Sequence, residues 1–288
     1  MAVFGLALCR LMQRWRLGLV FLLVLATAAP ARADLVDVAT VDGTILDATP
    51  QQVLYRTTGN APQVKLLDVA GGQTQTIPLT AASSNDFQRG ALIPGGAVIA
   101  TDTTNFPFRE LQEWQSGGVL TNLGGLNSSF DAAGDYVTWT SGQGHDLNRL
   151  QVSTSIATPV AANALNTGNH VDAGSGDVVF AGTVSGQSGY EVFRWHNGVT
   201  TPLSHQLPAR WAIEPEVDGS LVAYALRSPD GTVGGLAFHD GLTETVLDAA
   251  RWGGATAGDF ALSGGWLAFD RAHDPAFQPD EVWTRSPG

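Results

Sequence analysis

The feature that most constrains this chain is a short hydrophobic segment that recurs about every 43 residues. Each copy opens with an aliphatic residue, and in five of the six copies an aromatic residue stands two positions later. Residues i and i+2 of a β-strand point to the same face, so each segment is predicted to be a strand with its aromatic side chain on a fixed side. Because most copies lack polar alternation, these strands are expected to be buried on both faces. The six copies are Val53–Tyr55, Val98–Ala100, Val137–Trp139, Val178–Phe180, Val222–Tyr224 and Leu267–Phe269.

Turn residues divide each repeat into four strands. A Gly- or Asp-rich turn precedes the hydrophobic segment, and a polar loop and a second hairpin follow it. The clearest second hairpin is Phe193–Leu203, where Asn197-Gly198 supplies the residue pair that a tight hairpin turn favours. Four antiparallel strands in about 43 residues form a β-propeller blade. The sequence therefore predicts an all-β fold, a six-bladed β-propeller.

The two ends of the chain indicate how the propeller closes. The last repeat has only one further strand after its hydrophobic segment, Glu281–Thr284. The missing strand is expected to be Leu35–Ala39, which belongs to no other repeat. Pairing the first and last segments in one blade would seal the ring and remove an exposed edge. A stack of unrelated sandwiches or a solenoid is the alternative, but neither predicts a split final repeat. Residues 34–288 are thus expected to be one domain.

Residues 1–33 are typical of a secretory signal peptide. Arg10, Arg14 and Arg16 precede an apolar run at 17–25, and Ala31-Arg32-Ala33 provides a cleavage site after Ala33. The apolar run is shorter than the roughly 20 residues that span a bilayer. We therefore expect a periplasmic or extracellular protein that is not inserted in a membrane.

Composition narrows the possible partners. The only cysteine lies in the predicted signal peptide, so no disulfide is expected in the exported protein. The chain has 27 acidic and 15 basic residues, a net charge of −12. Such a surface repels nucleic acids and anionic lipids and is compatible with protein partners, cations and neutral ligands such as sugars. No nucleic-acid partner is expected, and nothing in the sequence indicates more than a monomer.

One stretch carries a family resemblance. The segment from Asp218 to Tyr224 has an Asp-Gly-Ser turn and then an apolar strand that ends in an aromatic residue. It resembles the blades of TolB-type six-bladed propellers of bacterial periplasms, which contain a Ser-Pro-Asp-Gly turn before such a strand. In this chain Ser228–Gly231 has that tetrapeptide, but in the loop that follows the strand. The resemblance extends over the exported chain at the level of pattern and implies the propeller fold and a periplasmic location.

Loops that lead into the first strand of each blade, or join its second and third strands, form the ligand face of a propeller. Arg210-Trp211 and Arg251-Trp252 lie at matching places in adjacent repeats, 41 positions apart. Two indoles with neighbouring guanidinium groups are suited to stacking on sugar rings or aromatic ligands. These four residues are therefore the predicted ligand-binding residues. The alternative is that both tryptophans pack one blade against the next.

His170, Glu214 and Asp259 lead into three successive blades. Converging imidazole and carboxylate groups can hold a divalent cation, so these residues are the candidate metal ligands. The alternative is that they are solvated loop residues or cap strand ends. No other cofactor is expected. His196 lies in a peripheral hairpin turn, where replacement by alanine is expected to be nearly neutral.

The sequence favours a non-enzymatic binding or scaffold propeller that engages a protein or a glycan on its loop rim. No G-x-S-x-G motif is present, and no catalytic residue is assigned. The alternative is a carbohydrate-active enzyme, a polysaccharide lyase or a glycoside hydrolase, with its site at the channel mouth. The two differ in whether imidazole and carboxylate groups converge within hydrogen-bonding distance.

Overall fold

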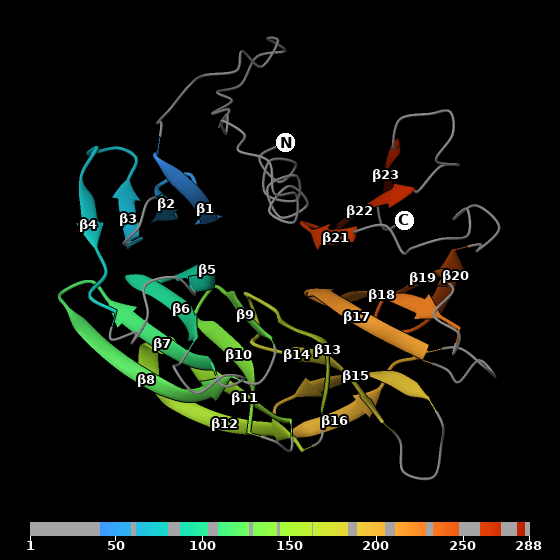
Figure 1. Ribbon diagram of the computed structural model, residues 1–288. Coiled ribbons are helices and arrows are strands. Elements are labelled where there is room, and N and C mark those ends of the chain that lie inside the picture. Colours follow the sequence, from blue (N-terminus) through green and yellow to red (C-terminus); the bar gives the residue numbers. More distant parts are fainter. Residues whose placement is uncertain are drawn as a thin grey trace. The chain divides into compact units, whose positions relative to one another are not determined.

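The computed structural model describes the chain in separate stretches between residues 41 and 285 (Figure 1). The described residues are 41–58, 62–79, 87–102, 109–126, 129–142, 145–162, 164–183, 189–204, 211–228, 233–247, 260–271 and 281–285. The predicted signal peptide, 1–33, and the predicted closing strand, Leu35–Ala39, lie outside these residues. The chain forms two compact units, residues 1–125 and residues 126–288.

The first unit holds two antiparallel sheets, each with its four strands in chain order. The strands of the first sheet are β1 (Gly43–Ala48), β2 (Gln52–Thr57), β3 (Val64–Asp68) and β4 (Thr74–Thr76). Those of the second sheet are β5 (Phe87–Ile93), β6 (Gly96–Asp102), β7 (Arg109–Gln115) and β8 (Val119–Leu126). Leu54 of β2 and Ile99 of β6 share one buried cluster, so the two sheets pack face to face.

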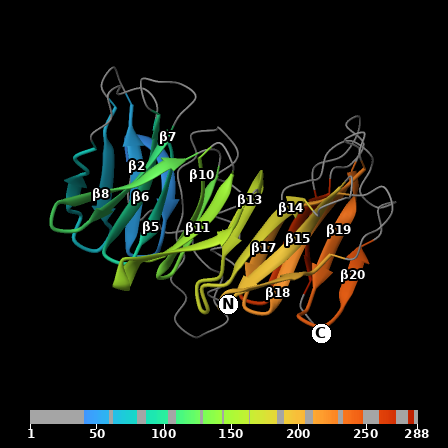
Figure 2. The ribbon, with the colours of Figure 1, turned by 90° about the horizontal axis from the view of Figure 1, so that it is seen from below.

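The second unit holds three four-stranded sheets and one sheet of three described strands (Figure 2). The third sheet contains β9 (Phe130–Ala133), β10 (Tyr136–Ser141), β11 (Asp146–Gln151) and β12 (Ile156–Ala161). The fourth sheet contains β13 (Ala164–Val171), β14 (Val178–Thr183), β15 (Tyr190–His196) and β16 (Val199–Pro202). The fifth sheet contains β17 (Trp211–Asp218), β18 (Leu221–Arg227), β19 (Val233–His239) and β20 (Glu244–Leu247), and the sixth contains β21 (Phe260–Ser263), β22 (Trp266–Arg271) and β23 (Glu281–Arg285). A single 3-10 turn, Val152–Thr154, is the only helical segment among the described residues.

The predicted repeat and its register are confirmed in the described residues. Each hydrophobic segment forms part of the second strand of its sheet, namely β2, β6, β10, β14, β18 and β22. The turn before the strand uses glycine at positive φ, for example Gly219 at 61°. The sixth sheet has its one predicted later strand as β23, and the proposed partner of that sheet, Leu35–Ala39, lies outside the described residues. Closure into a ring therefore stays a prediction.

Burial of the repeated strand on both faces is also confirmed. Phe180 of β14 clusters with Leu147 of the third sheet, while the adjacent Val179 clusters with Tyr224 of the fifth sheet. All four side chains are at most 4% exposed. Burying a large apolar side chain contributes about 1.5–3 kcal/mol, so the two faces of β14 join the fourth sheet to the third and to the fifth.

Carboxylates join the first strands of neighbouring sheets. A first strand pairs with its own sheet on one side only, so alternate backbone N–H groups point away from that sheet. In three cases a carboxylate from the preceding first strand accepts one of these bonds. The pairs are Asp47 with Leu92 N at 2.7 Å in the first unit, and Asp131 with Val171 N at 3.0 Å and Glu216 with Leu262 N at 2.9 Å in the second. These bonds satisfy donors that would otherwise be unpaired at a strand edge.

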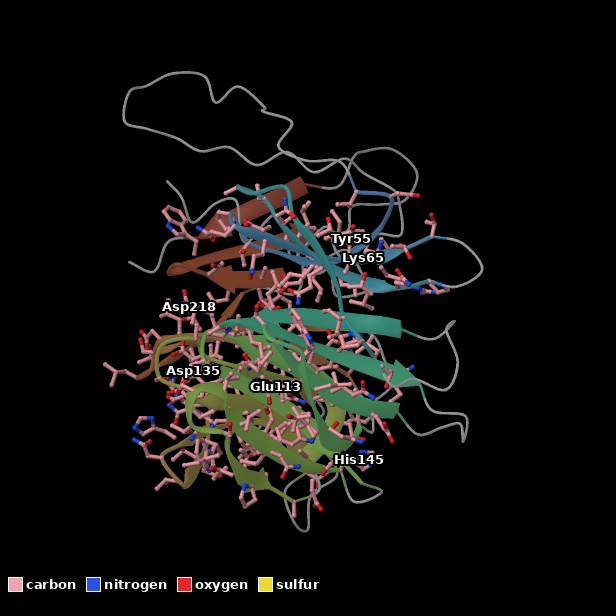
Figure 3. The ribbon with its side chains drawn as sticks, turned by 90° about the vertical axis from the view of Figure 1, so that its left-hand side faces the viewer. Tyr55, Lys65, Glu113, Asp135, His145 and Asp218 are labelled. Carbon is pink, nitrogen blue, oxygen red and sulfur yellow. The ribbon has the colours of Figure 1, made fainter. Side chains whose placement is uncertain are left out.

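In the second unit, carboxylates also bind the turns that connect the first and second strands of the neighbouring sheet. Asp172 accepts a bond from Gly219 N at 2.7 Å, and Asp218, which Figure 3 labels, accepts one from Gly265 N at 2.6 Å. Arg194 also donates to the carbonyl oxygen of Gly219 at 2.7 Å. Side chains of one sheet thus bind the turn between the first two strands of the next.

Candidate functional site

The first strands of the fourth and fifth sheets, β13 and β17, each have a shift in their pairing with the second strand. In β13, residues 165–168 stand opposite Ala181 alone, because Ala164 pairs with Gly182 and Asn169 pairs with Phe180. In β17 the register also shifts, between Ile213 and Glu216, so two residues stand opposite Tyr224. Such β-bulges redirect side chains and are frequent beside functional sites.

The two bulges touch. Gly168 in the β13 bulge has a φ of 114°, and a Cβ atom placed on it would lie 3.6 Å from Glu214 Cα. Glu214 itself has a φ of 54°, in the left-handed region that non-glycine residues rarely adopt. A backbone conformation of this kind persists only where the surrounding structure maintains it. The two bulges therefore lie side by side, with the left-handed Glu214 at their contact.

Four side chains gather beside these bulges, and we refer to Tyr190, Trp211, Glu214 and Arg227 as the Trp211 patch. The rings of Tyr190 and Trp211 meet edge to face, with centroids 4.9 Å apart and planes at 60°. Arg227 is the cross-strand partner of Trp211, so both side chains lie on the same face of the fifth sheet. The Arg227 guanidinium donates to Glu214 Oε1 at 3.1 Å. Tyr190 and Trp211 are partly buried, and the two charged side chains are about one-third exposed.

A buried polar cluster lies on the other side of the β13 bulge. Asn169 is 2% exposed, and its amide nitrogen donates to Ser129 Oγ at 2.9 Å. No described residue bonds to its Oδ1 atom. The neighbouring His170 has Nδ1 3.4 Å from Asp131 Oδ2, the same oxygen that accepts the bond from β13. A buried acceptor without a partner is uncommon in proteins and is a further indication that this bulge has a role beyond packing.

The structure does not test whether the predicted residues bind a ligand or a metal ion, and shows only where Trp211, His170 and Glu214 lie. Trp211 lies where predicted and packs against the adjacent sheet through Tyr190, as the packing alternative requires, but it also keeps an exposed part. Arg210, Arg251, Trp252 and Asp259 lie outside the described residues.

The two described candidate metal ligands each contact another side chain. His170 contacts Asp131, and Glu214 contacts Arg227. Among the described residues, no three His, Cys, Asp or Glu side chains are grouped so as to hold a metal ion. Because Asp259 is not among those residues, the predicted trio stays a prediction.

Tyr190 and the buried pair formed by Asn169 and Ser129 were not predicted as site residues. Tyr190 is the first residue of β15, the third strand of the fourth sheet. The sequence did not point to it because no aromatic residue recurs at this position of the repeat. Arg227 ends β18, the strand that holds the repeated segment, and its contact with Glu214 depends on the bulge. A one-residue change in strand register cannot be read from the hydrophobic pattern of β17.

His196 makes a contact that the sequence did not predict. It ends β15 at the predicted hairpin, and its side chain is 58% exposed, but its Nδ1 is 2.6 Å from Oδ1 of Asp177, which is 3% exposed. The same carboxylate binds Arg194. His196 therefore belongs to a partly buried hydrogen-bond network, and its replacement is not expected to be neutral.

Comparison with known proteins identifies no family. No family model matches the chain, and no curated protein matches it. Among the residues that the structure describes, no helix is long and apolar enough to cross a membrane.

Solved structures with the same type of fold do match, all at low sequence identity. A prolyl endopeptidase matches with a TM-score of 0.58 and 12% identity, over 83% of this chain and 40% of the other. An oligogalacturonate lyase solved in complex with manganese matches with a TM-score of 0.54 and 12% identity, over 86% and 77%. TolB from Acinetobacter baumannii matches with a TM-score of 0.49 and 14% identity, over 85% and 62%. This chain thus spans less than two thirds of the endopeptidase and of TolB. The likeness to the endopeptidase and the lyase, whose TM-scores exceed 0.5, indicates a shared propeller-type fold and assigns no activity.

Proposed function

We propose that this chain is an exported, non-enzymatic binding propeller that engages a protein or a glycan through the Trp211 patch. The observation that carries the proposal is the arrangement of Trp211, Tyr190, Glu214 and Arg227 beside two bulged strands. Together they offer an aromatic surface, a cation and an anion within one small area. Binding sites combine an apolar contact surface with a few positioned polar groups in this way.

The residues around the patch support a binding role over a purely structural one. The core of the fifth sheet is already built from aliphatic and aromatic residues such as Tyr224, which is fully buried. Glu214 and Arg227 remain about one-third exposed, and an exposed ion pair adds at most about 1 kcal/mol to stability. The strained backbone of Glu214 costs about 1–2 kcal/mol, so stability alone does not account for this arrangement.

Photo-crosslinking tests the binding role in the producing cell. A photoreactive benzoylphenylalanine at position 190 should form adducts with the bound partner, because Tyr190 belongs to the patch and its aromatic ring is replaced by another. The same group at position 136 is the control, since Tyr136 packs under Arg149 outside the patch. Adducts from position 190 that disappear in Arg227→Ala support the proposal. Equal adducts from both positions, or none from position 190, contradict it.

The carbohydrate-active enzyme is tested by product formation. The purified protein would be incubated with a set of polysaccharides, with and without divalent cations, and the products separated by size. Binding without shortening of the chains is expected. Shortened or unsaturated products that require His170 would instead support the lyase or hydrolase.

Export is part of the proposal and has its own test. Expression of the full chain in a bacterial host, followed by cell fractionation and N-terminal sequencing, should give a periplasmic or secreted protein that begins at Asp34. Retention of residues 1–33 in the cytoplasmic fraction would contradict it.

A further inference from the structure

Trp211 is held in a fixed orientation although part of it is exposed. Its ring meets Tyr190 edge to face at 4.9 Å, and a Cβ atom placed on Gly189 would lie 3.8 Å from Trp211 Cδ1. The indole therefore rests against one strand end of the fourth sheet. Because its orientation is set before a ligand arrives, little conformational entropy is lost when a flat group stacks on it.

The ion pair beside the indole presents donors and acceptors together. One contact of 3.1 Å joins Arg227 Nη2 to Glu214 Oε1. A guanidinium has five N–H donors and a carboxylate has about four acceptor positions, so most of them are not used by this contact. Sugar hydroxyl groups both donate and accept hydrogen bonds. Neighbouring hydroxyls of one ring can therefore bind the carboxylate and the guanidinium at once.

We propose that the ligand of the Trp211 patch is a neutral oligosaccharide, an inference that rests on the proposed function. The C–H face of a sugar ring would stack on the Trp211 indole, and its hydroxyls would bond to Glu214 and Arg227. An acidic sugar is disfavoured because the Glu214 carboxylate offsets the attraction of Arg227 for a uronate and the chain as a whole has a net charge of −12.

An extended peptide fits this part of the molecule less well. Peptides that add a strand to a sheet need a free row of backbone N–H and C=O groups at its edge. On β21, the first strand of the next sheet, Leu262 N already donates to the Glu216 carboxylate at 2.9 Å. Asp131 similarly occupies Val171 N at 3.0 Å on β13. These bonds take up backbone donors on the edges of β13 and β21, whereas the Trp211 patch offers side chains, which favours a ligand that binds through its rings and hydroxyls.

Calorimetric titration of the purified exported chain tests the ligand class. The probes are chitohexaose, cellohexaose and maltohexaose, with hexagalacturonate as the acidic comparison. At least one neutral oligosaccharide should bind about tenfold more tightly than hexagalacturonate. Trp211→Ala and Arg227→Lys should each weaken that binding by about tenfold or more, and Trp211→Phe, which keeps an aromatic ring against Tyr190, by less.

Trp266→Ala is the matched control, because Trp266 is also partly exposed, at 39%, but lies on β22 outside the patch. It should leave the affinity unchanged. Thermal unfolding of each variant identifies any that fail to fold, and Arg227→Lys then carries the test, since it keeps the charge.

The outcomes separate the inference from the proposed function. Preference for hexagalacturonate through Trp211 and Arg227, or no neutral oligosaccharide bound at all, overturns the inference. In either case the binding role stands if adducts from position 190 still depend on Arg227. Binding of a neutral oligosaccharide that is unaffected by both Trp211→Ala and Arg227→Lys overturns the inference and removes the patch from the proposed function.

Discussion

Asp172 should be among the most important single carboxylates for the stability of the second unit. It follows β13 and is 5% exposed. Its Oδ2 atom accepts bonds from Gly174 N at 3.0 Å, from Ser175 N at 2.6 Å and from Ser175 Oγ at 2.8 Å. Its Oδ1 atom accepts a bond of 2.7 Å from Gly219 in the next sheet. One side chain therefore closes its own turn and also joins two sheets.

Replacing Asp172 with alanine removes all four bonds. A hydrogen bond to a charged group contributes about 1.5–3 kcal/mol, but water can replace part of that at the exposed turn residues. We therefore expect Asp172→Ala to lower the free energy of unfolding by about 2–3 kcal/mol, a large effect for one site. The matched control is Asp240→Ala, because Asp240 also accepts three bonds, from Leu242 and Thr243, but all within its own exposed turn. Its effect should be clearly smaller.

The effect of Asp172 should also depend on pH. Burial raises the pKa of its carboxyl group, but the hydrogen bonds from Gly219, Ser175 and Gly174 outweigh burial, and the net pKa is lowered. A carboxyl group whose pKa is lower in the folded state stabilises the fold above its unfolded pKa of about 3.9, and this stabilisation is lost as the pH falls through the folded pKa. Urea unfolding of the wild type and of Asp172→Asn should therefore differ at pH 7 and converge at strongly acid pH. Equal midpoints for Asp172→Ala and Asp240→Ala at pH 7, or a wild-type advantage that persists at acid pH, would refute this reasoning.

Two further substitutions and one titration test the packing between strands. Phe180→Ala should lower the free energy of unfolding by about 3–5 kcal/mol in urea titrations, because Phe180 is 4% exposed and stacks on Phe193 at 5.5 Å. His196→Ala should lower it by about 1 kcal/mol through loss of the bond to the buried carboxylate of Asp177, and a neutral result would return His196 to its predicted role as a turn residue. Burial raises the pKa of Tyr224, and so does the hydrogen bond that its hydroxyl donates to the Glu244 carboxylate. The absorbance of the Tyr224 phenolate should therefore appear only when the protein unfolds in alkali. Ionisation of Tyr224 while the protein is still folded, seen in a stopped-flow titration, would contradict its burial.

The hydrophobic repeat was sufficient to predict the sheets. The segments that begin at Val178 and Val222 lie on second strands, β14 and β18, because alternating burial on two faces leaves a continuous apolar run in the sequence. The turns were predictable for a similar reason, since Asn197 and Gly198 have φ values of 48° and 85° that favour this residue pair. The pattern reports local geometry and therefore says little about how distant sheets meet.

The candidate site was only partly predictable. Trp211 has a repeated position, so its placement at a strand end followed from the sequence. Its contact with Tyr190 depends on how the fourth and fifth sheets pack, which the repeat does not specify. The unpaired Oδ1 atom of Asn169 depends on a bulge in β13 that places several extra residues opposite Ala181. Nothing in the composition of that segment distinguishes a bulge from a loop.

The acidic residues illustrate the same difference between composition and structure. The acidic composition predicts a negatively charged surface. Several of the carboxylates instead accept hydrogen bonds from backbone N–H groups of the next sheet, about one repeat further along the chain. Asp131 and Val171 are 40 positions apart, and Asp218 and Gly265 are 47 apart. In a chain whose only cysteine lies in the predicted signal peptide, these bonds supply cross-links between sheets that disulfides do not. The sequence shows the acidic residues at similar positions of the repeat. It does not show their partners, because every residue except proline has a backbone N–H group.

Glu214 and Glu216 show how one bulge separates a structural role from a proposed binding role. In a regular strand, residues two apart point to the same face, so the sequence Glu-Pro-Glu predicts two equivalent carboxylates. The register shift in β17 breaks that equivalence. Glu216 turns to the next sheet and bonds to Leu262 N, while Glu214 stays with its own sheet and binds Arg227 beside Trp211. The extra residue therefore leaves one carboxylate to hold the sheets together and keeps the other, with its strained backbone, partly exposed beside Trp211, in the proposed binding patch.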